Sequence, residues 1–94
     1  MAIGTLISTS TSATSTTVDG AKPTGIAVND LMVAFHTLDT DTTSTPPTDW
    51  VLIRRVVSQD SRIFSINSYY KFATSGDVAS STFTFTAGVS TAQT

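Results

Sequence analysis

His36 carries the side chain best suited to acid–base or metal chemistry, and it is the only histidine in the sequence. A transition-metal site of the usual form needs several nitrogen or sulfur ligands, but the chain has no cysteine and no second histidine. We therefore expect His36 to lie at the edge of the core or at an interface, where it contacts a partner or ligand.

Asp39, Asp41 and Asp49 could bind Ca²⁺ through oxygen, because they belong to one polar loop over residues 38–49. The full EF-hand pattern is absent from this loop. Solvated loop carboxylates are the better interpretation, so the sequence predicts no metal and no cofactor.

Catalytic patterns are also missing. The chain has no glutamate, and most of its seven aspartates stand at turn signals, where Asp bonds its own backbone. No G-x-S-x-G elbow is present for a nucleophilic serine. We predict a protein that is not an enzyme.

Aromatic and basic side chains are the remaining candidates for contacts with a ligand or a partner. Trp50, Tyr69 and Tyr70 could stack on a sugar; alternatively, Trp50 caps the core after Pro46-Pro47, one tyrosine points inward, and only Tyr69 is exposed. Arg54 and Arg55 fall on opposite faces of an expected strand, near a sheet edge. They could pair with aspartates of a neighbouring subunit or remain a solvated pair.

The composition limits the classes of function. The 94 residues suffice for one domain, and about a third of them are Ser or Thr, well above ordinary usage. A net charge of −2 argues against nucleic-acid binding, which needs a basic patch. No apolar run approaches the roughly 18 residues of a membrane span, and the start of the chain lacks the pattern of a secretory signal.

Alternation of apolar and polar residues predicts about five strands and no convincing helix. Strands are expected over 29–37, 50–57, 63–72 and 81–87. Residues 1–19 form either a Ser/Thr-rich arm or an edge strand near Thr14–Asp19, with a further short strand opening over Thr5–Ser8. Residues 20–94 form the domain. This pattern indicates an all-β antiparallel sandwich or jelly roll, either incomplete or completed by neighbouring subunits.

The strand over 29–37 has two apolar faces, so it should be the central strand, covered on both sides. We expect Phe64, Tyr70, Phe83 and Phe85 to fill one side. The side bearing Met32, Ala34 and His36 then needs the N-terminal arm, missing strands or another subunit. In the strand over 63–72, the side with Ser65, Asn67 and Tyr69 is the more polar one and is expected to be wet.

Three blocks of sequence, in this order, resemble a family of β-sandwich modules of tailed-phage virion proteins and some bacterial surface proteins. The blocks are KPTGIAVNDLMVAF (22–35), TPPTDWVLIRR (45–55), and YYKFATSGD (69–77) followed by ASSTFTF (79–85). Asn29 and Asp49 stand where related modules often have Gly, but both residue types tolerate left-handed turns. Related modules usually continue with further strands, which are absent here.

The resemblance implies a structural protein of a phage virion and no catalytic residues. Within it, we favour a capsid decoration or head-fibre subunit that forms a dimer or trimer and contacts other virion proteins. The alternative is a receptor-binding module of a tail fibre or adhesin that recognises a cell-surface glycan. A third possibility is a segment of a larger virion protein.

Overall fold

The computed structural model describes residues 12–59 and 63–94. These residues form six strands and one short helix. In chain order the elements are β1 (Ala13–Ala21), β2 (Leu31–Leu38), β3 (Ser44–Thr45), β4 (Val51–Gln59), β5 (Ile63–Phe72), α1 (Ser75–Ala79) and β6 (Thr82–Gln93). The short strand predicted near Thr5–Ser8 lies outside the described residues.

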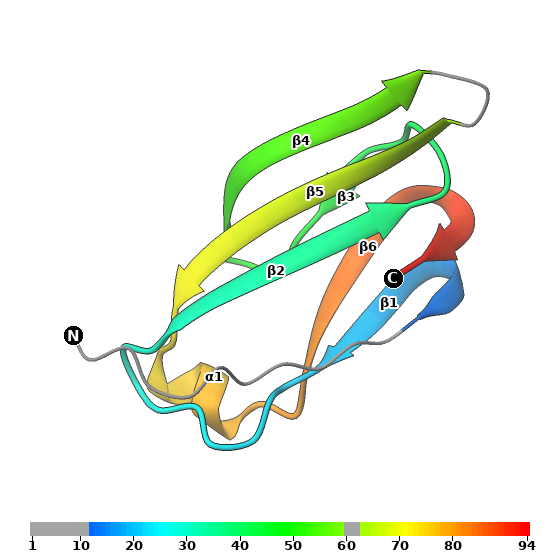
Figure 1. The fold of residues 1–94 in the computed structure, drawn as a ribbon. Coiled ribbons are helices and arrows are strands. Elements are labelled where there is room, and N and C mark those ends of the chain that lie inside the picture. Colours follow the sequence, from blue (N-terminus) through cyan, green and yellow to red (C-terminus); the bar gives the residue numbers. More distant parts are fainter. Residues whose placement is uncertain (1–11, 60–62) are drawn as a thin grey trace.

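The strands form one antiparallel sheet in the order β1-β6-β2-β5-β4, and β3 pairs with β6 beside this path. In Figure 1, β2, β5 and β4 run side by side as one half of the sheet, and β6 and β1 form the other half. The halves join where Leu38 of β2 pairs with Gln93 of β6. The prediction of an all-β antiparallel fold is confirmed, and β2 is the middle strand of the sheet order.

Strand bounds differ from the predicted ones mainly in the polar segments. β5 covers the predicted 63–72, but β6 continues to Gln93, and the polar loop contributes β3. The sequence predicted either an arm or an edge strand for the Ser/Thr-rich segment. In the structure, residues 13–21 form a strand at the edge of the sheet. Threonine favours this outcome because its branched side chain suits a pleated strand.

α1 was missed because it is a single turn, too short for apolar periodicity. Its signal is local: Thr74 accepts a hydrogen bond from the Asp77 backbone, and the Asp77 carboxylate accepts one from the Thr74 backbone N–H. This reciprocal capping box satisfies two donors at the start of the helix. Lys71 also donates to Asp77 at 3.0 Å.

Two turns depend on residues that tolerate the left-handed backbone region. Asn29 has φ of 75° and Asp49 has φ of 72°. They stand just before β2 and just before Trp50, and Asn and Asp are the non-glycine residues that enter this region most readily. The turns therefore form without glycine, as the sequence predicted.

The core lies between the two halves of the folded sheet. Val18 of β1, Tyr69 of β5 and Phe85 of β6 form its centre, and Trp50 and Phe83 pack against them. The Trp50 ring meets the rings of Phe83 and Phe85 edge-on, with centroids 5.6 and 5.8 Å apart. Trp50 thus packs onto the core after the Pro-Pro turn, as one of the two interpretations predicted.

The faces of the middle strand were assigned the wrong way round. Met32 and His36 lie on the buried side of β2, and the His36 ring is 5.4 Å from the Phe85 ring. Leu31, Val33 and Phe35 lie on the exposed side, so β2 is not covered on both sides by the described residues. Alternation shows which residues share a face, but it does not show which face packs inward.

Candidate interaction surface

The outer face of the β2–β5–β4 half is apolar and open to solvent. Cross-strand register places Leu31, Val33 and Phe35 opposite Phe72, Tyr70 and Ser68, and it places Val51 and Val56 opposite Tyr70 and Ile66. We call this surface the outer face; its apolar members are Leu31, Val33, Phe35, Val51, Val56, Ile66, Tyr70 and Phe72. Apart from the half-buried Tyr70, their exposed fractions range from 37% to 68%.

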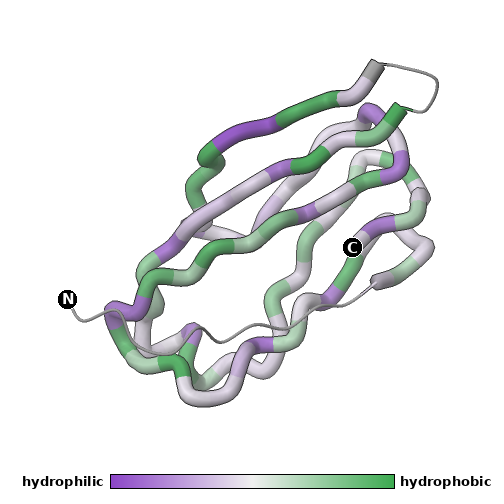
Figure 2. Tube along the Cα trace, viewed as in Figure 1, coloured by the Kyte–Doolittle hydropathy of each residue, from purple (hydrophilic) through white to green (hydrophobic). Residues whose placement is uncertain are grey.

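Figure 2 shows hydrophobic colour along β2 and toward both ends of β4, with a hydrophilic stretch between them on β4. That stretch carries Arg54 and Arg55. Single exposed apolar residues are ordinary on a protein surface, but a contiguous patch across three strands is typical of an interaction site.

The two arginines lie on opposite faces of the edge strand β4, as predicted. Arg54 is opposite Ser68 and therefore belongs to the outer face. Arg55 pairs with Asp41 and donates to the backbone oxygen of Thr42 at 2.7 Å. Arg55 is thus paired with a carboxylate of its own chain.

Inside the fold, a chain of polar side chains links five strands. His36 bonds through Nδ1 to Ser44 Oγ at 2.8 Å and through Nε2 to Gln93 Oε1 at 2.6 Å. Ser44 Oγ also bonds Tyr69 Oη at 2.5 Å, and Gln93 Nε2 donates to the Ser15 oxygen at 2.6 Å. A buried polar group without a partner is costly, so this closed network is what allows polar residues to occupy the core.

The hydrogen-bond network indicates which ring nitrogen of His36 carries the proton. Gln93 offers an acceptor oxygen, so His36 Nε2 carries the proton and Nδ1 accepts from the Ser44 hydroxyl. Burial lowers the pKa of His36 from its ordinary 6.5, and the Gln93 hydrogen bond opposes this shift only in part. His36 is therefore neutral in the folded protein at pH 7.

Ser44 and His36 superficially resemble a nucleophile and its base. However, the Tyr69 hydroxyl already bonds Ser44 Oγ, and His36 is 1% exposed. Of two grooves in the described residues, one of about 420 Å³ and one of about 330 Å³, neither is lined by Ser44 or His36. The hydrogen bond between these two side chains links β2 to β3.

The sequence analysis predicted an exposed Tyr69, and this prediction was wrong. It placed His36 at the edge of the core or at an interface, and in the structure His36 is buried in the core. Tyr69 is 3% exposed, and its hydroxyl bonds Ser44. Tyr70, the neighbour expected inward, has its side chain on the outer face. Trp50 is half-buried against Phe83 and Phe85, so Trp50 and Tyr69 do not form an exposed sugar-stacking platform.

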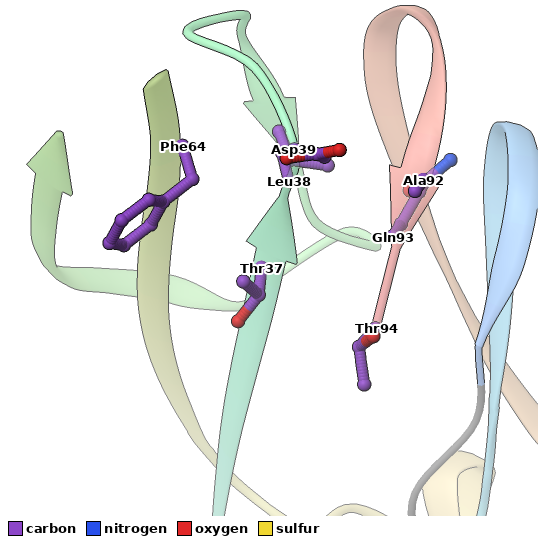
Figure 3. Close-up of a pocket in the computed structure, with 7 residues that line it drawn as sticks. All are labelled: Thr37, Leu38, Asp39, Phe64, Ala92, Gln93 and Thr94. Carbon is purple, nitrogen blue, oxygen red and sulfur yellow. The ribbon is translucent and has the colours of Figure 1, made fainter. Parts of the chain in front are cut away.

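The first groove is an open depression of about 420 Å³ at the end of the sheet where β2, β5 and β6 meet. Figure 3 shows Thr37, Leu38 and Asp39 of one segment facing Ala92, Gln93 and Thr94 of another, with Phe64 on β5. Asp39 is the titratable group in this lining. One aspartate in the lining of an open depression supports no particular chemistry.

The second groove, of about 330 Å³, lies between β2 and the β1–β6 half. Val18, Ala34, Phe35, Trp50, Phe83 and Phe85 form most of its apolar lining. It leads toward the core along a side of β2 that no described strand occupies. No local sequence pattern predicts this groove, because its walls come from distant parts of the chain.

The described residues contain no group of three or more His, Asp or Glu side chains placed to hold a metal ion. Asp39, Asp41 and Asp49 are all exposed, and Asp41 pairs with Arg55. Within the same residues, no helix has the length and apolar character needed to cross a bilayer.

Comparison with protein-family models, with curated proteins and with solved structures finds no match for this chain. The resemblance to phage β-sandwich modules therefore stays a prediction from the sequence.

Proposed function

We propose that this chain is a non-enzymatic structural subunit that assembles with further copies of itself through the outer face. The observation that carries the proposal is the burial pattern of β2: Phe35 is 68% exposed, whereas the adjacent His36 is 1% exposed. On β2, the polar His36 thus lies in the core, whereas the apolar Leu31, Val33 and Phe35 are exposed to water. Covering that face would remove the cost of hydrating it.

The size of the outer face fits this role. Its eight apolar side chains present on the order of 600 Å² of surface, given about 150–250 Å² for a whole aromatic side chain. Stable interfaces bury about 800 Å² from each partner, and the rim of a contact adds to its apolar centre. Cross-strand register places one charged residue, Arg54, on this face. When two copies meet through it, little charge of the same sign is therefore brought together.

We further propose that the folded sheet is an open β-sandwich and that the assembly belongs to a phage particle, as a capsid decoration or head-fibre subunit. The sandwich proposal rests on the core of Val18, Tyr69 and Phe85 between the two halves of the sheet. The phage proposal rests on the three sequence blocks alone. The glycan-binding alternative has lost its aromatic platform, because Tyr69 is buried.

The proposal is tested by the mass of the chain in solution. The wild-type protein should form a dimer or trimer at micromolar concentration, and Phe35→Ser combined with Val33→Ser should be monomeric and folded. Val89→Ser is the matched control, because Val89 is 50% exposed but lies on β6, away from the outer face. A monomeric wild type would refute assembly through this face.

A further inference from the structure

Residues of the outer face stand in rows that run across its three strands. β5 is the middle strand, and β2 and β4 each lie one strand spacing, about 5 Å, to either side of it. One row consists of Phe35 on β2, Ser68 on β5 and Arg54 on β4. The two neighbouring rows are Val33, Tyr70 and Val51 on one side, and Thr37, Ile66 and Val56 on the other. Phe35 and Arg54 are therefore placed symmetrically about β5, with the small Ser68 side chain between them.

Arg54 carries the charge of this surface and has no polar partner for it within residues 12–59 and 63–94. Its backbone oxygen accepts a hydrogen bond from Ser68 Oγ at 3.2 Å, but its guanidinium forms no hydrogen bond or ion pair with a described residue. Arg55, on the other face of β4, is paired with Asp41. When a second copy covers the outer face, Arg54 loses water, and this costs free energy unless the partner offers a compensating contact.

A second copy can lie on the outer face in two ways. Aligned sheets that pack face to face keep their strand directions within about 30° of one another, so a twofold axis between two copies runs nearly along the strands or nearly across them. An axis along β5 places β2 of each copy over the partner's β4 and keeps each row over the same row. An axis across the strands places β2 over the partner's β2 and β4 over the partner's β4, and it reverses the order of the rows.

The orientation with the axis along β5 gives Arg54 a suitable partner. It places each Arg54 over the partner's Phe35, and Phe35 is 68% exposed in a single copy. Sheets packed face to face are about 10 Å apart, so the two side chains meet between them, and Ser68 leaves space for them in that row. A guanidinium stacks favourably on an aromatic face, and the gain is larger where water is excluded.

The orientation with the axis across the strands is less favourable for Arg54. It brings both β4 strands to the same side of the interface, where two guanidinium groups repel each other in a layer without water. It also leaves Phe35 of both copies two strands away from either Arg54. One charged residue thus distinguishes between two orientations that apolar contacts alone leave open.

We propose that two copies assemble about a twofold axis along β5, with each Arg54 guanidinium stacked on the partner's Phe35 ring. This inference rests on the proposed assembly through the outer face, and it narrows that assembly to a dimer in one orientation. Arg54 sets the orientation, and the apolar rows supply most of the buried surface. The two stacking contacts are equivalent, because a twofold interface is isologous.

Crosslinking between single cysteines tests the orientation. The chain has no cysteine, so each introduced thiol is unique. In the proposed dimer Val33 lies over the partner's Val51, so a mixture of Val33→Cys and Val51→Cys chains should be crosslinked by a short thiol reagent such as dibromobimane. Neither variant alone should be crosslinked, because Val33 and the partner's Val33 lie two strand spacings apart across β5. Mass spectrometry of the crosslinked peptides identifies the positions that are joined.

The outcomes separate this inference from the proposed function. A dimer in which the mixed chains do not crosslink, or in which Val33→Cys crosslinks on its own, would overturn the orientation and leave assembly through the outer face standing. A trimer would overturn the twofold arrangement in the same way. A wild-type protein with the mass of one chain would refute the proposed function and this inference together.

The dissociation constant of the dimer tests the stacking contact itself. Arg54→Gln should raise it at least about fivefold, because each dimer loses two contacts between a cation and a ring. Arg55→Gln is the matched control on the other face of the same strand and should leave the constant unchanged. In a Phe35→Leu background, Arg54→Gln should have little effect, because the ring is already gone. An Arg54→Gln variant that dimerises as tightly as the wild type, or more tightly, would overturn the proposal.

Discussion

Phe35 and His36 are neighbours in the sequence and lie on opposite faces of β2, with the phenylalanine 68% exposed and the histidine 1% exposed. The same reversal occurs on β5, where Ser65, Asn67 and Tyr69 are buried and Ile66 and Phe72 are exposed. Hydrogen bonds between distant residues hold the buried polar side chains, and the apolar outer face is exposed to solvent.

Phe85 and Phe35 should respond very differently to truncation. Phe85 is buried among Trp50, Tyr69 and His36, so Phe85→Ala should lower the free energy of unfolding by about 3–5 kcal/mol. Phe35→Ala, measured on the monomer, should change it by about 0.5 kcal/mol or less. Chemical denaturation measures both, and equal losses would contradict the assigned faces.

Stability should decline when the solution is acidified below about pH 6.5, because His36 is neutral in the fold. Its folded pKa lies below its ordinary 6.5, so the unfolded chain binds more protons between these two pKa values. The contribution is complete above pH 6.5 and is lost as the pH falls toward the folded pKa. His36→Gln should remove this part of the slope of unfolding free energy against pH; an unchanged slope would show that another group titrates.

The Ser44 side chain should contribute more to stability than its position in a polar loop suggests. Ser44→Ala leaves His36 Nδ1 and the Tyr69 hydroxyl without a shared partner, so it should cost about 1–3 kcal/mol of unfolding free energy. Thr45→Ala is the matched control, since Thr45 is exposed in the same short strand and should change stability by about 0.5 kcal/mol or less. Similar losses in the two variants would argue against the network.

The capping box at α1 gives a local prediction. Thr74→Ala removes the acceptor for the Asp77 backbone N–H and should cost about 0.5–2 kcal/mol, whereas Ser75→Ala, at an exposed neighbour, should cost little. Thermal unfolding measures both.

Asp77 should also make the contribution of this cap to stability depend on pH in acid. Burial tends to raise the pKa of Asp77, but hydrogen bonds from Thr74 and Lys71 lower it below the ordinary 3.8. Its contribution is therefore present above about pH 3.8 and is lost as the pH falls toward the folded pKa. Asp77→Asn should reduce this low-pH slope.

Much of the fold could be predicted from residue patterns that are local. The alternation over 63–72 gives β5 with its observed bounds, and turn-compatible Asn29 and Asp49 stand where the backbone needs a positive φ. β3 and the extension of β6 to Gln93 could not be predicted, because their pairing depends on partners far away in the chain.

The candidate surface could be predicted only in part. Alternation correctly groups Leu31, Val33 and Phe35 on one face, yet burial was assigned to the wrong side. The buried side is polar because Ser15, His36, Ser44, Tyr69 and Gln93 satisfy one another, and the Gln93 bond to Ser15 spans 78 positions. A hydrogen-bond network of that range leaves no periodic signal in the sequence.

The most direct test of the central claim is the mass of the wild-type chain and of Val33→Ser/Phe35→Ser, measured by light scattering coupled to size exclusion. One chain has a mass of 9.9 kDa, so we predict two or three times that value for the wild type and for Val89→Ser. The double variant should have the mass of one folded chain. A wild type with the mass of one chain, or a double variant that still assembles, would contradict assembly through the outer face.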